Sequence, residues 1–218
     1  MKTDMQLQQD VLEELKFEPK TREAEIGIAI KDGVVTLAGT VNSYAQKYAA
    51  ERTAERVGGV RAVANELEVQ LPGSYQRTDT ELAHAIVNAL RWDINVPDDR
   101  VKATVNAGWV ELEGEVEWQY QKWAADSAIR NLTGIKGVAN LIKVKPKKVS
   151  TYEVSQKIRD SLRRHAERDA DKITIEAKNG EVTLRGTVSS FAERQDAERA
   201  AWQAPGVTRV EDFIAVIY

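Results

Sequence analysis

The 218-residue sequence predicts an α+β protein built from three tandem copies of one α-β-β-α-β unit. One segment recurs as DGVVTLAGTV, AGWVELEGEV and NGEVTLRGTV, and its second glycine keeps constant offsets of 75 and 72 residues. Hydrophobic residues of helical and strand period surround the segment in the same order in each copy. Each unit should be a three-stranded mixed sheet with two helices packed on one face. The expected units are 1–72, 73–148 and 149–218.

An amphipathic helix should open each unit, because aliphatic pairs four residues apart fall on one helical face. These pairs are Val11 and Leu15, Ile86 and Leu90, and Ile158 and Leu162. Alternating apolar residues then predict a strand with one buried face. The inward positions are Ile26, Ile28 and Ile30, Val101, Ala103 and Val105, and Ile173, Ile175 and Ala177.

A tight turn should join the first two strands, because glycine there tolerates positive φ. The turns are Asp32-Gly33, Ala107-Gly108 and Asn179-Gly180. The returning strand directs alternate apolar residues inward, namely Val35 and Leu37, Val110 and Leu112, and Val182 and Leu184. A glycine then interrupts the strand and predicts a bulge or a close backbone approach. These glycines are Gly39, Gly114 and Gly186.

The second helix should lie close to the sheet, because small alanines recur on one of its faces. A glycine-centred turn then leads to the last strand. The turn glycines are Gly59, Gly134 and Gly206, and the strands end at Val69, Val144 and Val216.

Composition excludes several classes of function. The net charge of −3 lacks the basic surplus of a nucleic-acid binder, so no nucleic-acid partner is expected. The chain has no cysteine, which excludes disulfides and thiolate chemistry. The charged opening is unlike a signal peptide, and no apolar run approaches the ~20 residues of a membrane span. We therefore expect a soluble, cytoplasmic protein.

These segments resemble the BON domain, named for bacterial osmotically inducible and nodulation proteins. The resemblance rests on G-x-V-x-L-x-G-x-V at 33–41, 108–116 and 180–188. It also rests on a shared ending, which reads GVRAVANELEV at 59–69, GIKGVANLIKV at 134–144 and GVTRVEDFIAV at 206–216. The resemblance implies a non-enzymatic, transport-associated protein linked to osmotic and envelope stress. It also implies binding to phospholipid surfaces, as for several members, or to potassium, as for one relative.

No catalytic site, cofactor or metal is expected. The two histidines, His84 and His165, do not occupy equivalent repeat positions, and Glu81-x-x-His84 matches only half of a di-iron motif. Alternation along a strand places the glutamates of 111–117 on one solvated face. Phosphate-cradling loops and nucleophile elbows are also missing from the sequence.

One polar position recurs late in every unit, as Asn65, Asn140 and Asp212. It could contact a ligand or donate an oxygen to a cation. A hydrogen bond to local backbone is the favoured interpretation, because Asn and Asp commonly make one.

The middle unit differs from its sisters in its aromatic residues. It holds Trp92, Trp109, Trp118 and Trp123, four of the five tryptophans, beside Tyr75 and Tyr120. The sister units carry Val34 and Glu181, Ser43 and Ser190, and Tyr48 and Gln195 at the last three tryptophan positions. Residues that the sisters replace with serine or glutamate lie outside a unit's own core, so these aromatics are surface features.

Two interpretations of the aromatics follow. Packing between units or subunits is the preferred one. The other is a lipid-facing edge formed by Trp118, Tyr120, Lys122 and Trp123. The lysines that follow could add attraction to anionic lipid. They are Lys143, Lys145, Lys147 and Lys148.

The leading functional hypothesis is reversible binding to an anionic phospholipid surface through these aromatics and lysines. The first alternative is a potassium sensor that uses backbone carbonyls or the Asn65 position. The second is an assembly protein whose aromatics serve a homo-oligomer.

Overall fold

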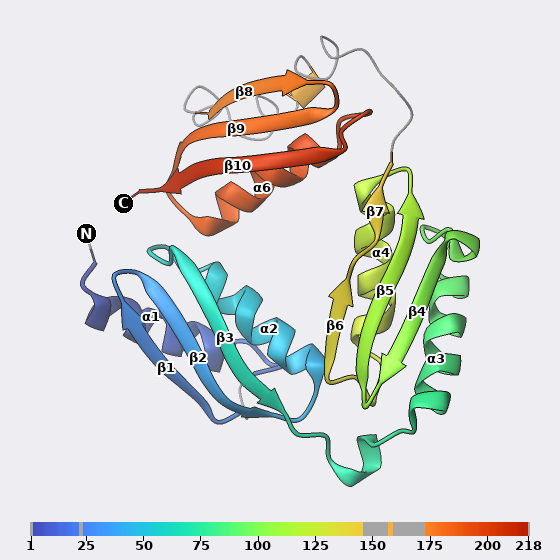
Figure 1. The fold of residues 1–218 in the computed structure, drawn as a ribbon. Helices are drawn as coiled ribbons and strands as arrows, with labels where there is room; N and C mark the ends of the chain where they lie inside the picture. Colours follow the sequence, from blue (N-terminus) through green and yellow to red (C-terminus); the bar gives the residue numbers. More distant parts are fainter. Residues whose placement is uncertain (1, 22–23, 146–156, 159–172, 218) are drawn as a thin grey trace.

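The computed structural model describes residues 2–21, 24–145, 157–158 and 173–217. It confirms the α-β-β-α-β order in the first two units and the β-β-α-β part of the third (Figure 1). Apart from 157–158, the helix predicted to open the third unit lies outside the described residues. The first unit contains α1 (Asp4–Phe17), β1 (Ile26–Lys31), β2 (Val34–Val41), α2 (Tyr44–Glu55) and β3 (Ala62–Val69). The second contains η1 (Gly73–Tyr75), α3 (Asp79–Trp92), η2 (Asp98–Arg100), β4 (Val101–Asn106), β5 (Trp109–Val116), α4 (Gln119–Arg130), β6 (Gly137–Asn140) and β7 (Lys143–Val144). The third contains β8 (Ile173–Lys178), β9 (Glu181–Val188), α6 (Phe191–Trp202) and β10 (Arg209–Val216).

Each unit has a mixed sheet, as expected for this fold class. The first two strands form an antiparallel hairpin, and the last strand pairs in parallel with the hairpin's second strand. The middle sheet departs from the prediction of three strands. Its last strand is divided at Leu141–Ile142 into β6 and β7, both of which pair with β5. This sheet therefore has four strands rather than three.

The helices of the first two units pack on one face of their sheets. In the first unit, Val11 and Leu15 of α1 share a core with Val35 and Leu37 of β2 and with Ala50 of α2. The second unit repeats this arrangement with a core that joins α3, β5 and α4. In the third unit Ile158 is buried in the core, whereas Leu162 lies outside the described residues. The inward positions predicted for the strands are confirmed by alternating burial.

The strand glycines mark close backbone approaches without a bulge. A Cβ at Gly39 would overlap the carbonyl oxygen of Glu25, and one at Gly114 would overlap that of Arg100. The pairing of β2 with β3 is continuous through Gly39, and the pairing of β5 with β6 and β7 keeps the same register on both sides of Gly114. The nine repeat glycines all have positive φ, and they are Gly33, Gly39, Gly59, Gly108, Gly114, Gly134, Gly180, Gly186 and Gly206.

The hairpin turns are held by a contact that the sequence did not predict. Two consecutive residues have positive φ in each turn, as in Ala107 (φ 50°) and Gly108 (φ 83°). The backbone amides of both residues donate to the carboxylate of Asp79, at 2.7 and 3.0 Å. Asp4 accepts the equivalent bonds from Asp32 and Gly33 in the first unit. The first helix therefore fixes the hairpin turn as well as covering the sheet.

Candidate functional site

The start of the second helix separates the middle unit from its sisters. In the outer units Ser43 and Ser190 occupy the N-cap, and their hydroxyls accept the amides of Gln46 and Glu193 at 3.2 Å. The middle unit has Trp118 at this place, which makes no side-chain cap hydrogen bond. The middle unit thus lacks the side-chain cap that both sisters have, and the amide of Gln121 donates instead to the backbone carbonyl of Trp118 at 3.1 Å.

The other half of the cap is retained. The Oε1 atom of Gln121 accepts the amides of Glu117 and Trp118, each at 3.0 Å. Gln46 and Glu193 make similar bonds to the loop amides in the outer units. The helix therefore begins at the same place in all three units, and the substitution at Trp118 affects only one of the two cap contacts.

Trp118 belongs to a cluster at one end of the middle unit. Its ring lies 6.5 Å from that of Tyr120, centroid to centroid. Trp92, the last residue of α3, is 85% exposed, and Ile94 beyond it is 97% exposed. We call the set of Trp92, Ile94, Trp118 and Tyr120 the aromatic end. In Figure 1 it lies where α3 finishes and α4 begins.

Ion pairs fix the loops of the aromatic end. Arg91 pairs with Asp98 at 3.8 Å, which joins the end of α3 to η2. Arg100 of η2 pairs with Glu117 at 3.5 Å, which joins it to the loop before α4. The two apolar loops therefore share one end of the unit. Trp92 was among the aromatics of the middle unit but not among the predicted site residues, and Ile94 was not predicted. An aromatic residue, Phe17, occupies the position equivalent to Trp92 in the first unit, and this recurrence could have marked Trp92. Phe17 is also exposed.

The lysines that the sequence grouped with the aromatics are only partly gathered there. Lys143 is exposed beside Glu115 on the outer face of the sheet, and Lys145 forms an ion pair with Glu115. Burial lowers the pKa of Lys122, opposed by the nearby carboxylate of Asp126. Lys147 and Lys148 lie outside the described residues. The described surroundings of the aromatic end are thus balanced in charge rather than basic.

Trp109 does not join the aromatic end. It lies at the hairpin end of β5, seven positions from Val116, and is 58% exposed. Its ring covers Gly137 of β6, where a Cβ would overlap it. The sister units fill the same cross-strand pair with Val34 and Ala62, and with Glu181 and Arg209. Trp109 and Gly137 therefore form a cross-strand pair on the outer face of the sheet, and both of its residues differ in each sister unit.

Packing of these aromatics between units or subunits, the preferred interpretation, stays a prediction. Trp109 stays 58% exposed, Tyr120 50% and Trp123 38%. The first unit instead supplies the aromatics at its junction with the second. The guanidinium of Arg130 lies 3.6 Å from the centroid of the Tyr48 ring, and Tyr44 packs against the middle core. Burial, then the charge of Asp126, raises the pKa of Tyr44 to about 12.

The recurrent polar position ties the second helix to the last strand. Asn65 accepts the amide of Leu67 and donates to the Lys47 carbonyl, both at 3.3 Å. Asn140 repeats both contacts, with Ile142 and Lys122. The favoured interpretation, a bond to local backbone, is confirmed here. In the third unit Asp212 keeps the strand contact and pairs with Arg194 at 2.6 Å. A carboxylate cannot donate to a carbonyl, so a cation from the helix replaces that bond.

The glutamates of β5 form an exposed stripe. Glu111, Glu113 and Glu115 point away from the core, as the alternation predicted. Among the residues that the structure describes, no group of three or more acidic, His or Cys side chains is arranged to hold a metal ion.

The described helices are also too short or too polar to cross a membrane.

Together these features define a class: a tandem array of small α+β modules in which one copy presents an aromatic surface. The sequence pattern of the BON domain matches residues 3–70, 78–146 and 151–218. The chain therefore belongs to the BON domain family.

A relative from Escherichia coli (strain K12), osmotically-inducible protein Y, is 34% identical over 128 residues. The match covers 57% of this chain and 64% of the length of that protein. Two solved structures of CdsD, a structural protein of the Type III secretion system of Chlamydia trachomatis, are each 12% identical. The first covers 100% of both chains with a TM-score of 0.28, and the second covers 96% and 91% with a TM-score of 0.24. Likeness at these scores carries no functional inference.

Proposed function

We propose that this protein is a non-enzymatic, osmotic-stress-related module that associates reversibly with phospholipid surfaces through the aromatic end of its middle unit. The observation that carries the proposal is Trp118 at the helix N-cap, where both sister units keep a serine. Replacing a capping serine costs about 1 kcal/mol of stability. A feature that gives up stability in one copy alone is expected to serve a function of that copy.

The chemistry of the aromatic end suits the interface between headgroups and acyl chains. Tryptophan and tyrosine concentrate at that depth, because their rings are apolar and their N–H and O–H groups reach water. Trp92 and Ile94 project from one loop, and Trp118 and Tyr120 lie at the next. Such a surface would enter the headgroup layer without a membrane-spanning helix.

Charge plays the smaller part in this proposal. Lys145 and Arg100 form ion pairs with glutamates. Lys143, close to the last described residue of the middle unit, is an exposed cation. Each lysine near an anionic surface contributes about 1 kcal/mol. Anionic lipid should therefore strengthen the association, while the aromatics supply most of the affinity.

The stress-related part of the proposal is supported by the relative from E. coli, whose name records osmotic induction. The BON resemblance in all three units supports the same role.

The test is co-sedimentation with vesicles of phosphatidylcholine and phosphatidylglycerol in equal parts, at low salt. The variant W118S/Y120A carries the residues of both sister units, Ser43 and Ala45 or Ser190 and Ala192. Each buried aromatic is worth roughly 1.5–3 kcal/mol, so the variant should bind at least tenfold more weakly.

W109V is the matched control, because it installs a sister residue at the opposite end of β5. It should bind as the unmodified protein does. The proposal fails if the unmodified protein does not sediment with these vesicles, or if W118S/Y120A binds equally well. Vesicles of phosphatidylcholine alone should retain part of the binding, since the aromatics rather than the lysines dominate.

A further inference from the structure

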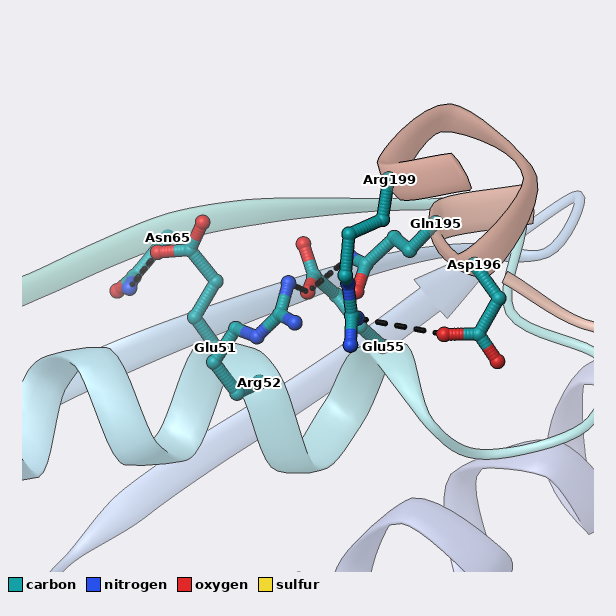
Figure 2. A network of polar contacts seen from close by, with 7 residues as sticks. All are labelled: Glu51, Arg52, Glu55, Asn65, Gln195, Asp196 and Arg199. Carbon is teal, nitrogen blue, oxygen red and sulfur yellow. Dashed lines mark hydrogen bonds and ion pairs between the residues drawn. The ribbon is translucent and has the colours of Figure 1, made fainter. Parts of the chain in front are cut away.

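Among the described residues, side-chain contacts join the first unit to the second and the third unit to the first, and both sets use the second helices. Between the first and second units, Arg130 of α4 stacks on Tyr48 of α2. Between the third and first units, Gln195 of α6 donates to Glu55 of α2 at 2.8 Å (Figure 2). The second contact lies at the opposite end of α2 from the first.

The repeat offsets show that these contacts are equivalent. Tyr48 and Gln195 occupy the same repeat position, and so do Arg130 and Glu55. In both junctions, the residue one turn into a second helix meets the residue near the C-terminal end of the neighbour's second helix. The third unit therefore meets the first as the first meets the second.

A cleft also lies at each of these two junctions, next to the end of the last strand of one unit. A cleft of about 520 Å³ lies between Val69, at the end of β3, and Ala107 and Lys136 of the second unit. Another, of about 370 Å³, lies between Val216, at the end of β10, and Asp32 and Arg61 of the first unit. These three residues of each cleft correspond under the repeat offsets, whereas the other lining residues of the two clefts differ. The helix contacts and these three shared positions together fit a single operation that relates neighbouring units.

We infer that the three units close into a ring with approximate three-fold symmetry, in which the second unit docks on the third by the same contact. The operation already takes the third unit to the first and the first to the second. Where that operation is a three-fold rotation, one further application takes the second unit to the third. Figure 1 shows α2, α6 and α4 following one another head to tail around the centre of the molecule.

The repeat positions identify the residues of the third junction. Trp123 corresponds to Tyr48 and Gln195, and Trp202 corresponds to Glu55 and Arg130. Both corresponding positions thus carry tryptophan, which supplies large contact area at low entropic cost. Trp123 is 38% exposed and Trp202, the last residue of α6, is partly buried. Closure joins these two side chains.

Closure within one chain is the expected outcome for this head-to-tail contact. Heterologous contacts either close into a ring or propagate into a filament. The two open ends belong to consecutive units of the same chain, which gives them an effective concentration of about millimolar. Closing in cis therefore outcompetes a second copy at ordinary protein concentrations.

The absence of cysteine from the sequence permits a direct test. The variant W123C/W202C, treated with a short bis-maleimide, should cross-link within one chain and migrate as a monomer of altered mobility. E55C/Q195C is the positive control, because its side chains are in contact. W109C/W202C is the negative control, since Trp109 lies at the far end of β5. Circular dichroism should verify that each variant folds.

Cross-linked dimers or larger species from W123C/W202C would overturn closure in cis in favour of head-to-tail assembly. No cross-link, alongside efficient reaction of E55C/Q195C, would overturn the ring altogether. A second measurement uses a chain in which Trp123 is the single tryptophan. Acrylamide should quench its fluorescence more strongly with Glu at position 202, as in the first unit, than with Phe. Equal quenching of the two variants would also contradict the ring.

Discussion

The middle unit and its two sisters share one fold, and they differ most at the start of the second helix. Ser43 and Ser190 cap that helix, whereas Trp118 leaves the same amide without a side-chain partner. Positions that agree in all three units serve the fold, because each unit must bury the same core. Positions at which the three units carry different residues are not needed for that core. The comparison therefore separates residues that maintain the fold from residues available for function, and each prediction below tests that separation.

The largest effect is expected at a position that agrees. Leu112 is fully buried, as are its counterparts Leu37 and Leu184. Leu112→Ala should lower the free energy of unfolding by about 2–5 kcal/mol, from lost burial and the cavity it leaves. Leu141→Ala, at an exposed position of the same unit, should change it by no more than about 0.5 kcal/mol. Urea unfolding followed by circular dichroism measures both, and similar losses would mean that exposure does not identify the core.

The next effect concerns the cap itself. At position 118, Ser and Ala differ in their ability to accept the amide of Gln121, while both remove the indole. W118S should therefore be more stable than W118A by about 1 kcal/mol, and Ser43→Ala should cost a similar amount. Both variants at 118 should lose vesicle binding equally. If W118A matched W118S in stability, Trp118 would impose no cost on the helix.

The fold was predictable because the three units repeat the same local patterns. The alternating apolar residues of the strands, the two-residue turns and the alanines on one face of the second helix can each be recognised in a continuous stretch of sequence. Contacts that join distant segments were not predictable. The carboxylate of Asp79 accepts the backbone amides of Ala107 and Gly108, and no local sequence pattern predicts this contact. The aromatic end could not be predicted without knowing that the end of α3 and the start of α4 lie at the same end of the unit. The junctions between units use equivalent repeat positions, but the residues there differ in every unit, so the sequence alone did not mark them as contacts.

A smaller effect is expected at the hairpin turn of the middle unit. Ala107 has φ of 50°, where the outer units carry Asp32 and Asn179. Asn and Asp occupy this left-handed region at lower cost than alanine. Ala107→Asn should therefore raise the free energy of unfolding by up to about 1 kcal/mol. Asn179→Ala should lower it by a similar amount. A thermal unfolding series settles the sign, and a destabilised A107N would show that the contact with Asp79 requires the smaller residue.

The smallest effect concerns Glu55, whose sisters are Arg130 and Trp202. Burial raises the pKa of the Glu55 carboxyl, and hydrogen bonds from Gln195 and the charge of Arg52 oppose that shift, while Glu51 adds to it. Because its folded pKa is raised, the folded protein holds more protons at this site than the unfolded chain. Stability from Glu55 is therefore complete below its ordinary pKa of 4.5 and is lost as pH rises through the raised pKa.

Glu55→Gln removes this titration and keeps an acceptor for Gln195. The variant should gain stability relative to the unmodified protein as pH rises from about 4.5 toward neutrality. Glu66→Gln, at an exposed position of β3, should follow the unmodified protein throughout. Urea midpoints measured across this pH range make the comparison. If the two variants ran parallel, Glu55 would be solvated and the junction between α2 and α6 would be open in solution. A divergence confined to Glu55→Gln would show that this junction stays closed and dry.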